Sequence, residues 1–119
     1  MRTIIVGLNF GKGGDFEASM EELHLLVNSA GGDVLAAVTG TRKSPDAKLY
    51  IGSGKAEEVK LDVDMHRADC VVFNHAISPA QQRNLEANLG VRIMDRTALI
   101  LDLFSQRAQS HAGKLQVEM

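Results

Sequence analysis

The sequence predicts an α/β fold: a single domain in which a four-stranded, mainly parallel sheet carries helices on both faces. Short apolar runs of strand length alternate along the chain with segments whose apolar residues recur at steps of three and four. Strands that alternate with helices build parallel sheets through right-handed crossovers. The 119 residues, 45% hydrophobic and 24% charged, match one globular domain in length and composition.

Four apolar runs, several of them rich in β-branched residues, are predicted to form the strands. They lie at Arg2–Asn9, Val34–Val38, Cys70–Phe73 and Val91–Met94. A brief extended piece is also expected at residues 49–51. Residues 40–48, which include Pro45, are expected to form a polar loop because proline cannot donate to a strand ladder.

Capping residues indicate where the first two helices begin and end. Asp15 precedes the first helical pattern, and Gly31-Gly32 follows it as a stop signal. Ser53 is placed to cap a second helix that runs to about His66. Glu57 and Glu58 are then expected in the favourable first turn of that helix.

The last two helices have their own start signals. Ser78-Pro79-Ala80-Gln81 combines an N-cap serine, proline at the first helical position and a glutamine that closes a capping box. This helix is expected to end at Gly90. Thr97 is placed to cap a final helix over Ala98–Ala108, whose apolar residues lie nearly all round it and predict that it is mostly buried.

Composition excludes several classes of function. The apolar stretches are far shorter than the roughly 20 residues of a membrane span, so a soluble, cytoplasmic protein is expected. Cys70 is the only cysteine, which rules out an intramolecular disulfide and favours a buried strand thiol. No second histidine or carboxylate is spaced with His75 to form a metal site, and no catalytic residues are predicted.

Charge is polarised along the chain, although the formal net charge is only −2. The first helix is acidic, whereas the segment from residue 42 to residue 55 carries four basic side chains against Asp46 alone. These are candidates for contacts with RNA or phosphate. The basic residues are Arg42, Lys43, Lys48 and Lys55.

Gly52-Ser53-Gly54-Lys55 invites comparison with a phosphate-binding P-loop, and the comparison fails. Leu49 stands where the first P-loop glycine belongs, and Ala56 stands where serine or threonine would hold magnesium. A glycine-rich helix N-terminus can still bind an anion through its free N–H groups. The sequence leaves open both a phosphate or nucleic-acid contact and a plain tight turn with a solvated lysine.

The carboxyl ends of parallel strands share one edge of a sheet, where ligands often bind. Several polar residues are expected there, and the glycine-rich turn at residues 11–14 follows the first strand without the spacing of a dinucleotide-binding motif. His75 is expected to be a solvated loop residue rather than a base. The polar residues at this edge are Asn9, Thr41, Asn74, His75 and Asp95.

Arg96 is electrostatically unusual because it stands at the positive N-terminus of the final helix. Either the adjacent Asp95 or an external anion can neutralise it. The adjacent acid is the favoured partner because it is always present. Arg96 remains a candidate phosphate contact.

Several ordered motifs occur together from residue 49 onward. They are Tyr50-Ile51-Gly52-Ser53-Gly54-Lys55, Ser78-Pro79-Ala80-Gln81-Gln82-Arg83-Asn84-Leu85, Asp95-Arg96-Thr97, Leu101-Asp102-Leu103-Phe104-Ser105-Gln106-Arg107-Ala108 and Gly113-Lys114-Leu115-Gln116-Val117-Glu118. Read together, these segments closely resemble the N-terminal domain of the HflX family of ribosome-associated GTPases. The region before residue 49 agrees with that family mainly in its pattern of strands and helices.

The resemblance implies an N-terminal α/β domain over residues 1–109 and the start of a truncated helical extension or linker over residues 110–119. It further implies a separate G domain that binds and hydrolyses GTP with Mg²⁺, and docking on the large ribosomal subunit and its RNA. Some members are linked to ATP binding through the N-terminal region, so a nucleotide-binding or nucleotide-hydrolysing domain in its own right is the alternative. Candidates for contact with the chain's own G domain are Arg107, Lys114, Leu115 and Val117.

Overall fold

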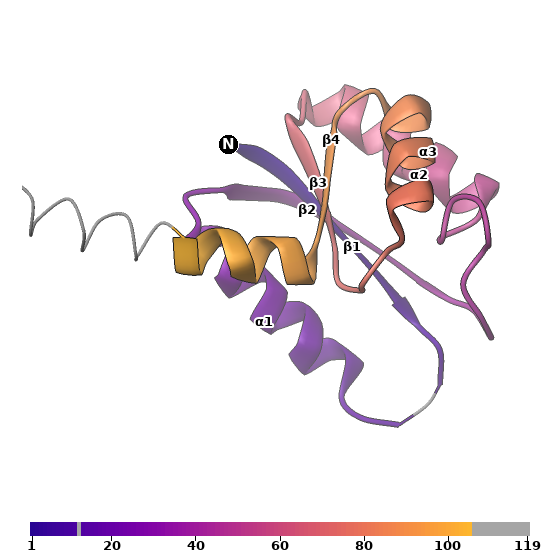
Figure 1. The fold of residues 1–119 in the computed structure, drawn as a ribbon, viewed down its shortest axis with the longest axis horizontal. Coiled ribbons are helices and arrows are strands. Elements are labelled where there is room, and N and C mark those ends of the chain that lie inside the picture. Colours follow the sequence, from indigo (N-terminus) through magenta and orange to yellow (C-terminus); the bar gives the residue numbers. More distant parts are fainter. Residues whose placement is uncertain (12, 106–119) are drawn as a thin grey trace, which may run out of the picture.

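The computed structural model describes residues 1–11 and 13–105, and within these ranges the chain forms a four-stranded sheet whose strand pairs are all parallel (Figure 1). The strands lie in the order β2-β1-β3-β4. Their bounds are Arg2–Asn9 for β1, Asp33–Thr41 for β2, Cys70–Phe73 for β3 and Arg92–Asp95 for β4. The predicted α/β fold class is confirmed.

Helices cover both faces of this sheet. The helices are α1 (Phe16–Ser29), α2 (Ser53–His66), α3 (Pro79–Leu89) and a further helix whose described part spans residues 96–105. Figure 1 shows α1 and the 96–105 helix together on one face, with α2 and α3 on the other. None of the helices within the described ranges is long and apolar enough to cross a bilayer.

The central strand β1 is buried on both sides, so its side chains alternate between two apolar layers. Ile4 and Val6 pack in the layer formed with α2 and α3. Ile5 packs in the opposite layer, together with Leu23 of α1 and Leu99 of the 96–105 helix. A strand buried on both faces reads as an unbroken apolar run, which is why the sequence located β1 correctly.

Local signals at the helix ends are borne out for α1 and α3. Asp15 accepts a hydrogen bond from the N–H of Ala18 at 3.0 Å and caps α1. Ser78 and Gln81 form the reciprocal capping box at the start of α3, and Gly90, with φ of 71°, ends that helix. Cys70 is fully buried as predicted, and burial raises the pKa of its thiol to about 11.

The start of α2 differs from the prediction. Gly52 is the N-cap residue, no side chain caps the helix, and Ser53 is its exposed first residue. Glu57 and Glu58 therefore lie beyond the first turn. The segment before it is not extended, because Tyr50 has a left-handed φ of 66° and pairs with Asp46 in an isolated antiparallel bridge. A serine beside a glycine that can adopt the cap conformation is not by itself a cap.

The final helix begins earlier and is more exposed than predicted. Asp95, not Thr97, caps it, accepting a hydrogen bond from the N–H of Ala98 at 2.7 Å. Leu99 is buried, whereas Leu101 and Phe104 are 63% and 64% exposed. Within the described residues, this helix is therefore buried on one side only, although apolar residues lie nearly all round it.

The bounds of two strands also change. β2 begins one residue earlier than predicted, at Asp33, and continues three residues beyond Val38 to Thr41, while β4 is shifted by one residue to Arg92–Asp95. The proposed boundary after residue 109 lies outside the described residues, and so do the candidate G-domain contacts Arg107, Lys114, Leu115 and Val117.

Candidate functional site

The carboxyl ends of the strands meet at one edge of the sheet, where two hollows of about 380 Å³ each flank β1. The first lies at the ends of β1 and β3, beside the start of α1. The second lies at the end of β2, beside the start of α2. The predicted edge residues are therefore divided: Asn9, Asn74 and His75 line the first hollow, Thr41 lines the second, and Asp95 lines neither.

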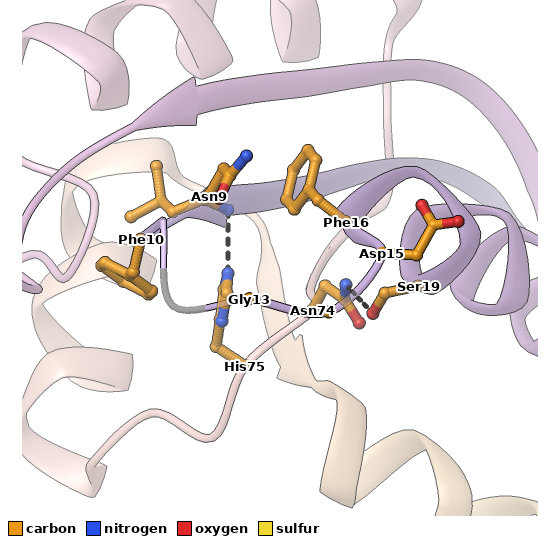
Figure 2. Close-up of a pocket in the computed structure, with 10 residues that line it drawn as sticks. Asn9, Phe10, Gly13, Asp15, Phe16, Ser19, Asn74 and His75 are labelled. Carbon is orange, nitrogen blue, oxygen red and sulfur yellow. Dashed lines mark hydrogen bonds between the residues drawn. The ribbon is translucent and has the colours of Figure 1, made fainter.

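The first hollow, shown in Figure 2, lies between two neighbouring strands whose connections lead in opposite directions, the usual ligand position in such sheets. Glycine-rich backbone at Gly13 and Gly14 forms part of its wall. Asp15 also lines it and already occupies the N-terminus of α1 as its cap. A carboxylate at this position opposes the binding of an anion there.

His75 is half-buried at the edge of this hollow and is held by the fold, in contrast to the predicted solvated loop residue. Its Nε2 accepts a hydrogen bond from the backbone N–H of Leu8 at 2.8 Å. The rings of Phe10 and Tyr50 lie with centroids 5.4 Å and 5.2 Å from the imidazole. Burial lowers the pKa of His75, and an imidazole that accepts a backbone hydrogen bond must be neutral at that nitrogen.

Arg96 lies on the α1 side of the sheet in a polar network. It donates to Oδ1 of the buried Asn74 at 2.9 Å and to Oγ of Ser19 at 3.3 Å, and it forms an ion pair with Glu22. Its acidic partner is thus Glu22 rather than the adjacent Asp95. Asp95 instead accepts hydrogen bonds from two backbone N–H groups, including that of Ile77 at 3.1 Å.

The second hollow surrounds the uncapped start of α2. Gly52 has φ of 83°, and a Cβ built there would lie 2.6 Å from Nη1 of Arg42, so the guanidinium rests directly over this glycine. Nε of Arg42 donates to the carbonyl of Ser44 at 3.0 Å. The free N–H groups of the first turn and the guanidinium bring positive charge to this hollow, and the carboxylate of Asp46, which also lines it, brings one negative charge.

Lys55 also lines the second hollow, but its ammonium already has partners. It donates to the carbonyl of Thr39 at 3.0 Å and to Glu58 at 2.8 Å. With Leu49 and Ala56 in place of the conserved P-loop residue types, this turn does not fit a GTP–Mg²⁺ site. Among the described residues, no group of three or more histidine, cysteine or acidic side chains is placed to hold a metal ion.

The residues predicted to contact RNA or phosphate therefore do not form one surface. Those that line the second hollow are Arg42, Gly52, Ser53, Gly54 and Lys55. Lys43 and Lys48 are exposed on the loop that leads to it. Arg96 lies on the opposite face of the sheet, with α1.

Two α3 side chains that contact the basic loop, residues 42–50, were not indicated by the sequence. Nε2 of Gln81 donates to the carbonyl of Asp46 at 2.8 Å, and Nδ2 of Asn84 donates to the carbonyl of Lys48 at 3.0 Å. The capping box accounted for Gln81 locally. The one sequence signal for their contact with the loop is the spacing of Gln81 and Asn84, two polar residues three positions apart near the start of a helix.

We expect the Arg96 network to depend more on the buried amide than on the ion pair. Arg96→Ala leaves the buried Asn74 oxygen without its donor and should lower the free energy of unfolding by about 1–3 kcal/mol. Glu22→Ala should cost less than about 1 kcal/mol, because Glu22 is 61% exposed and screened by water. Urea unfolding of both variants measures the difference, and equal losses would contradict this assignment.

The lowered pKa of His75 predicts a stability that falls with acidification. Below the unfolded-state pKa of about 6.5, the unfolded chain binds a proton that the folded chain does not, so the free energy of unfolding decreases until pH reaches the lower folded pKa. Urea unfolding at pH 7.5 and 5.5 should show a smaller pH-dependent loss in His75→Gln than in the wild type. His24→Gln, at an exposed position, is the control and should retain the wild-type pH dependence.

Comparison with known proteins gives this fold a family. A family model described as "GTP-binding GTPase N-terminal" matches residues 17–105. The chain is 47% identical over 118 residues to GTPase HflX of Escherichia coli strain K12, covering 99% of this chain and 28% of that protein. It is 42% identical over 105 residues to GTPase HflX of Alkalihalophilus pseudofirmus, covering 88% and 25%. The chain thus spans about a quarter of the length of these curated relatives.

Solved structures share the fold. The crystal structure of an SsGBP and GDP complex superposes with a TM-score of 0.71 at 25% identity, covering 99% of this chain and 33% of that one. A GTP-binding protein from Sulfolobus solfataricus in complex with GDP superposes with a TM-score of 0.66 at 24% identity, covering 88% and 30%. Together with the match over residues 17–105, the high coverage by HflX relatives establishes that this chain belongs to the GTP-binding GTPase N-terminal family, as the N-terminal domain of an HflX-type GTPase.

Proposed function

We propose that this domain is a non-catalytic module of a longer, cytoplasmic HflX-type GTPase. It docks on the large ribosomal subunit through that subunit's RNA, and it regulates a separate G domain during ribosome splitting. The observation that carries the proposal is the basic segment at the second hollow. There the guanidinium of Arg42 lies over Gly52, and the exposed Lys43 and Lys48 follow Arg42 along the loop. Lysine and arginine contacts to phosphate supply most of the non-specific affinity for nucleic acid.

The arrangement of charge supports docking rather than catalysis. The second hollow has an uncapped helix start, and its one ammonium, Lys55, already has two protein partners. Such a surface attracts phosphate without holding a reacting group in place. In this proposal GTP and Mg²⁺ bind in the G domain. These 119 residues dock the protein on the ribosome and supply no catalytic group.

Contact with the G domain is supported by apolar surface on the 96–105 helix. Phe104 is 64% exposed, and with Leu26, Ile100 and Leu103 it lines an apolar groove of about 230 Å³ beside α1. Apolar side chains gathered in this way are typical of contact surfaces. A G domain or a helical extension packed here would transmit docking of this domain to the GTPase cycle.

Docking through phosphate contacts predicts a steep dependence of affinity on salt. Contacts from Arg42, Lys43 and Lys48 should lower the affinity for purified bacterial large ribosomal subunits by about 40-fold between about 50 and 200 mM salt, taking a slope near 0.9 per contact. Lys48→Ala should reduce that loss to about 12-fold, because one contact is removed. Cosedimentation across a salt series measures both.

Lys60→Ala is the matched control for this measurement, because it removes the same charge from an exposed position on α2 outside the basic loop. It should retain the wild-type salt dependence. If the wild-type affinity were flat across the salt series, or if Lys60→Ala and Lys48→Ala behaved alike, docking by the basic loop would be wrong.

The alternative, a domain that binds or hydrolyses ATP itself, is favoured by one observation. The first hollow lies where doubly wound sheets bind nucleotides, and its wall includes the backbone of Gly13 and Gly14. Against it stands the carboxylate of Asp15 at the start of α1, which repels a phosphate group.

Calorimetric titration with ATP and with GTP decides the alternative. We expect no measurable heat at millimolar nucleotide. A saturable signal would support nucleotide binding, and two variants would then locate it: Asn9→Ala should weaken a site in the first hollow, and Lys55→Ala a site in the second. A saturable signal that neither variant weakens would place nucleotide outside both hollows.

A further inference from the structure

The basic loop, residues 42–50, is fastened to α3 by two side-chain amides. Gln81 donates to the carbonyl of Asp46 at 2.8 Å, and Asn84 donates to the carbonyl of Lys48 at 3.0 Å. The two residues are three positions apart on the helix and so share one face. Both bonds end on main-chain oxygens, so they hold the path of the loop rather than any one of its side chains.

The loop also has its own internal order. The backbones of Asp46 and Tyr50 exchange two hydrogen bonds, of 2.8 Å and 3.1 Å. Oδ2 of Asp46 accepts from the N–H groups of Lys48 at 3.0 Å and of Leu49 at 2.7 Å. These bonds hold the pKa of the Asp46 carboxyl below its ordinary value, with the Leu49 N–H contributing most. They close a tight turn around Lys48.

That turn is anchored on its inner side by apolar burial. Leu49 and Tyr50 are only 7% and 9% exposed, and Ile51 is 1% exposed. Lys48 itself points into solvent on the outer side. The two amides of α3 therefore fix the part of the loop that apolar burial does not reach.

Gln81 performs two tasks with one amide group. Its Oε1 accepts from the N–H of Ser78 at 3.0 Å in the capping box, while its Nε2 donates to the loop. A glutamate could complete the same capping box but has no proton to give to the carbonyl of Asp46. Donation to the loop thus requires an amide here, whereas the cap does not.

We propose that Gln81 and Asn84 are positioning residues that hold the basic loop in the conformation in which it meets RNA phosphates. This inference rests on the proposed docking function and adds to it residues that carry no charge and touch no RNA. A loop fixed in its bound conformation loses less conformational entropy on binding. We call the hydrogen bonds from Gln81 and Asn84 to the loop the clamp. Removing either bond should therefore weaken binding without removing a phosphate contact.

Asn84→Ala tests the clamp, with Asn88→Ala as its matched control. Asn88 is an exposed asparagine on the same helix, so the control removes the same group from outside the loop contact. Loss of one such hydrogen bond should speed amide hydrogen exchange at Lys48 and Leu49 by about 2- to 10-fold and weaken large-subunit binding by a similar factor. The salt dependence should stay at the wild-type value, because no charge is lost.

Gln81→Glu separates the clamp from the cap and is tested by hydrogen exchange alone, because its new charge would itself disturb RNA binding. Amide exchange in the loop should rise, while the first turn of α3 should stay as protected as in the wild type. Loss of protection in both places would mean that Gln81 acts only through the helix cap.

The outcomes distinguish the two proposals. Faster loop exchange with weaker binding at an unchanged salt dependence supports the clamp, and unchanged exchange in Asn84→Ala overturns it. Faster exchange with wild-type binding, when Lys48→Ala does weaken binding, overturns positioning and leaves docking intact. Failure of the wild-type chain to bind subunits overturns docking, and the exchange result alone then decides whether the amides hold the loop.

Discussion

The pairing of β1 with a strand on each side is the constraint on which the rest of this structure depends. β1 pairs with β2 along its full length and with β3 on its other edge. The chain passes from β1 to β2 through α1 and returns to β3 through α2, so the two connections lie on opposite faces of the sheet. The first hollow lies at the carboxyl ends of β1 and β3, where the connections of neighbouring strands lead in opposite directions.

The two hollows differ chemically because different groups stand at the helix starts. Asp15 closes the start of α1 with a carboxylate, and a neutral His75 fills space beside it. Gly52 leaves the start of α2 open beneath the guanidinium of Arg42. One edge of the sheet thus presents a hollow with a carboxylate at its helix start next to one whose helix start is open and faces a guanidinium, and the position of a single capping side chain contributes to the contrast.

The sequence predicted those features that neighbouring residues determine. The apolar run of β1 and the capping box at Ser78 depend on residues within a few positions, and both were located correctly. The pairing of Arg96 with Glu22 joins residues 74 positions apart, so only the packed fold brings it about. The start of the last helix was missed because Asp95 and Thr97 are both good capping residues, and strand β4 ends at the earlier one.

The attachment of the basic loop through its main chain has a consequence for how this surface can change. Because Gln81 and Asn84 bind carbonyl oxygens, substitutions of the outward side chains at Lys43 and Lys48 leave the bonds that shape the loop intact. Substitutions can therefore change the charge of the loop while its backbone conformation stays the same. The affinity of this surface for a partner can change step by step through such substitutions, without a loss in the free energy of unfolding at each step.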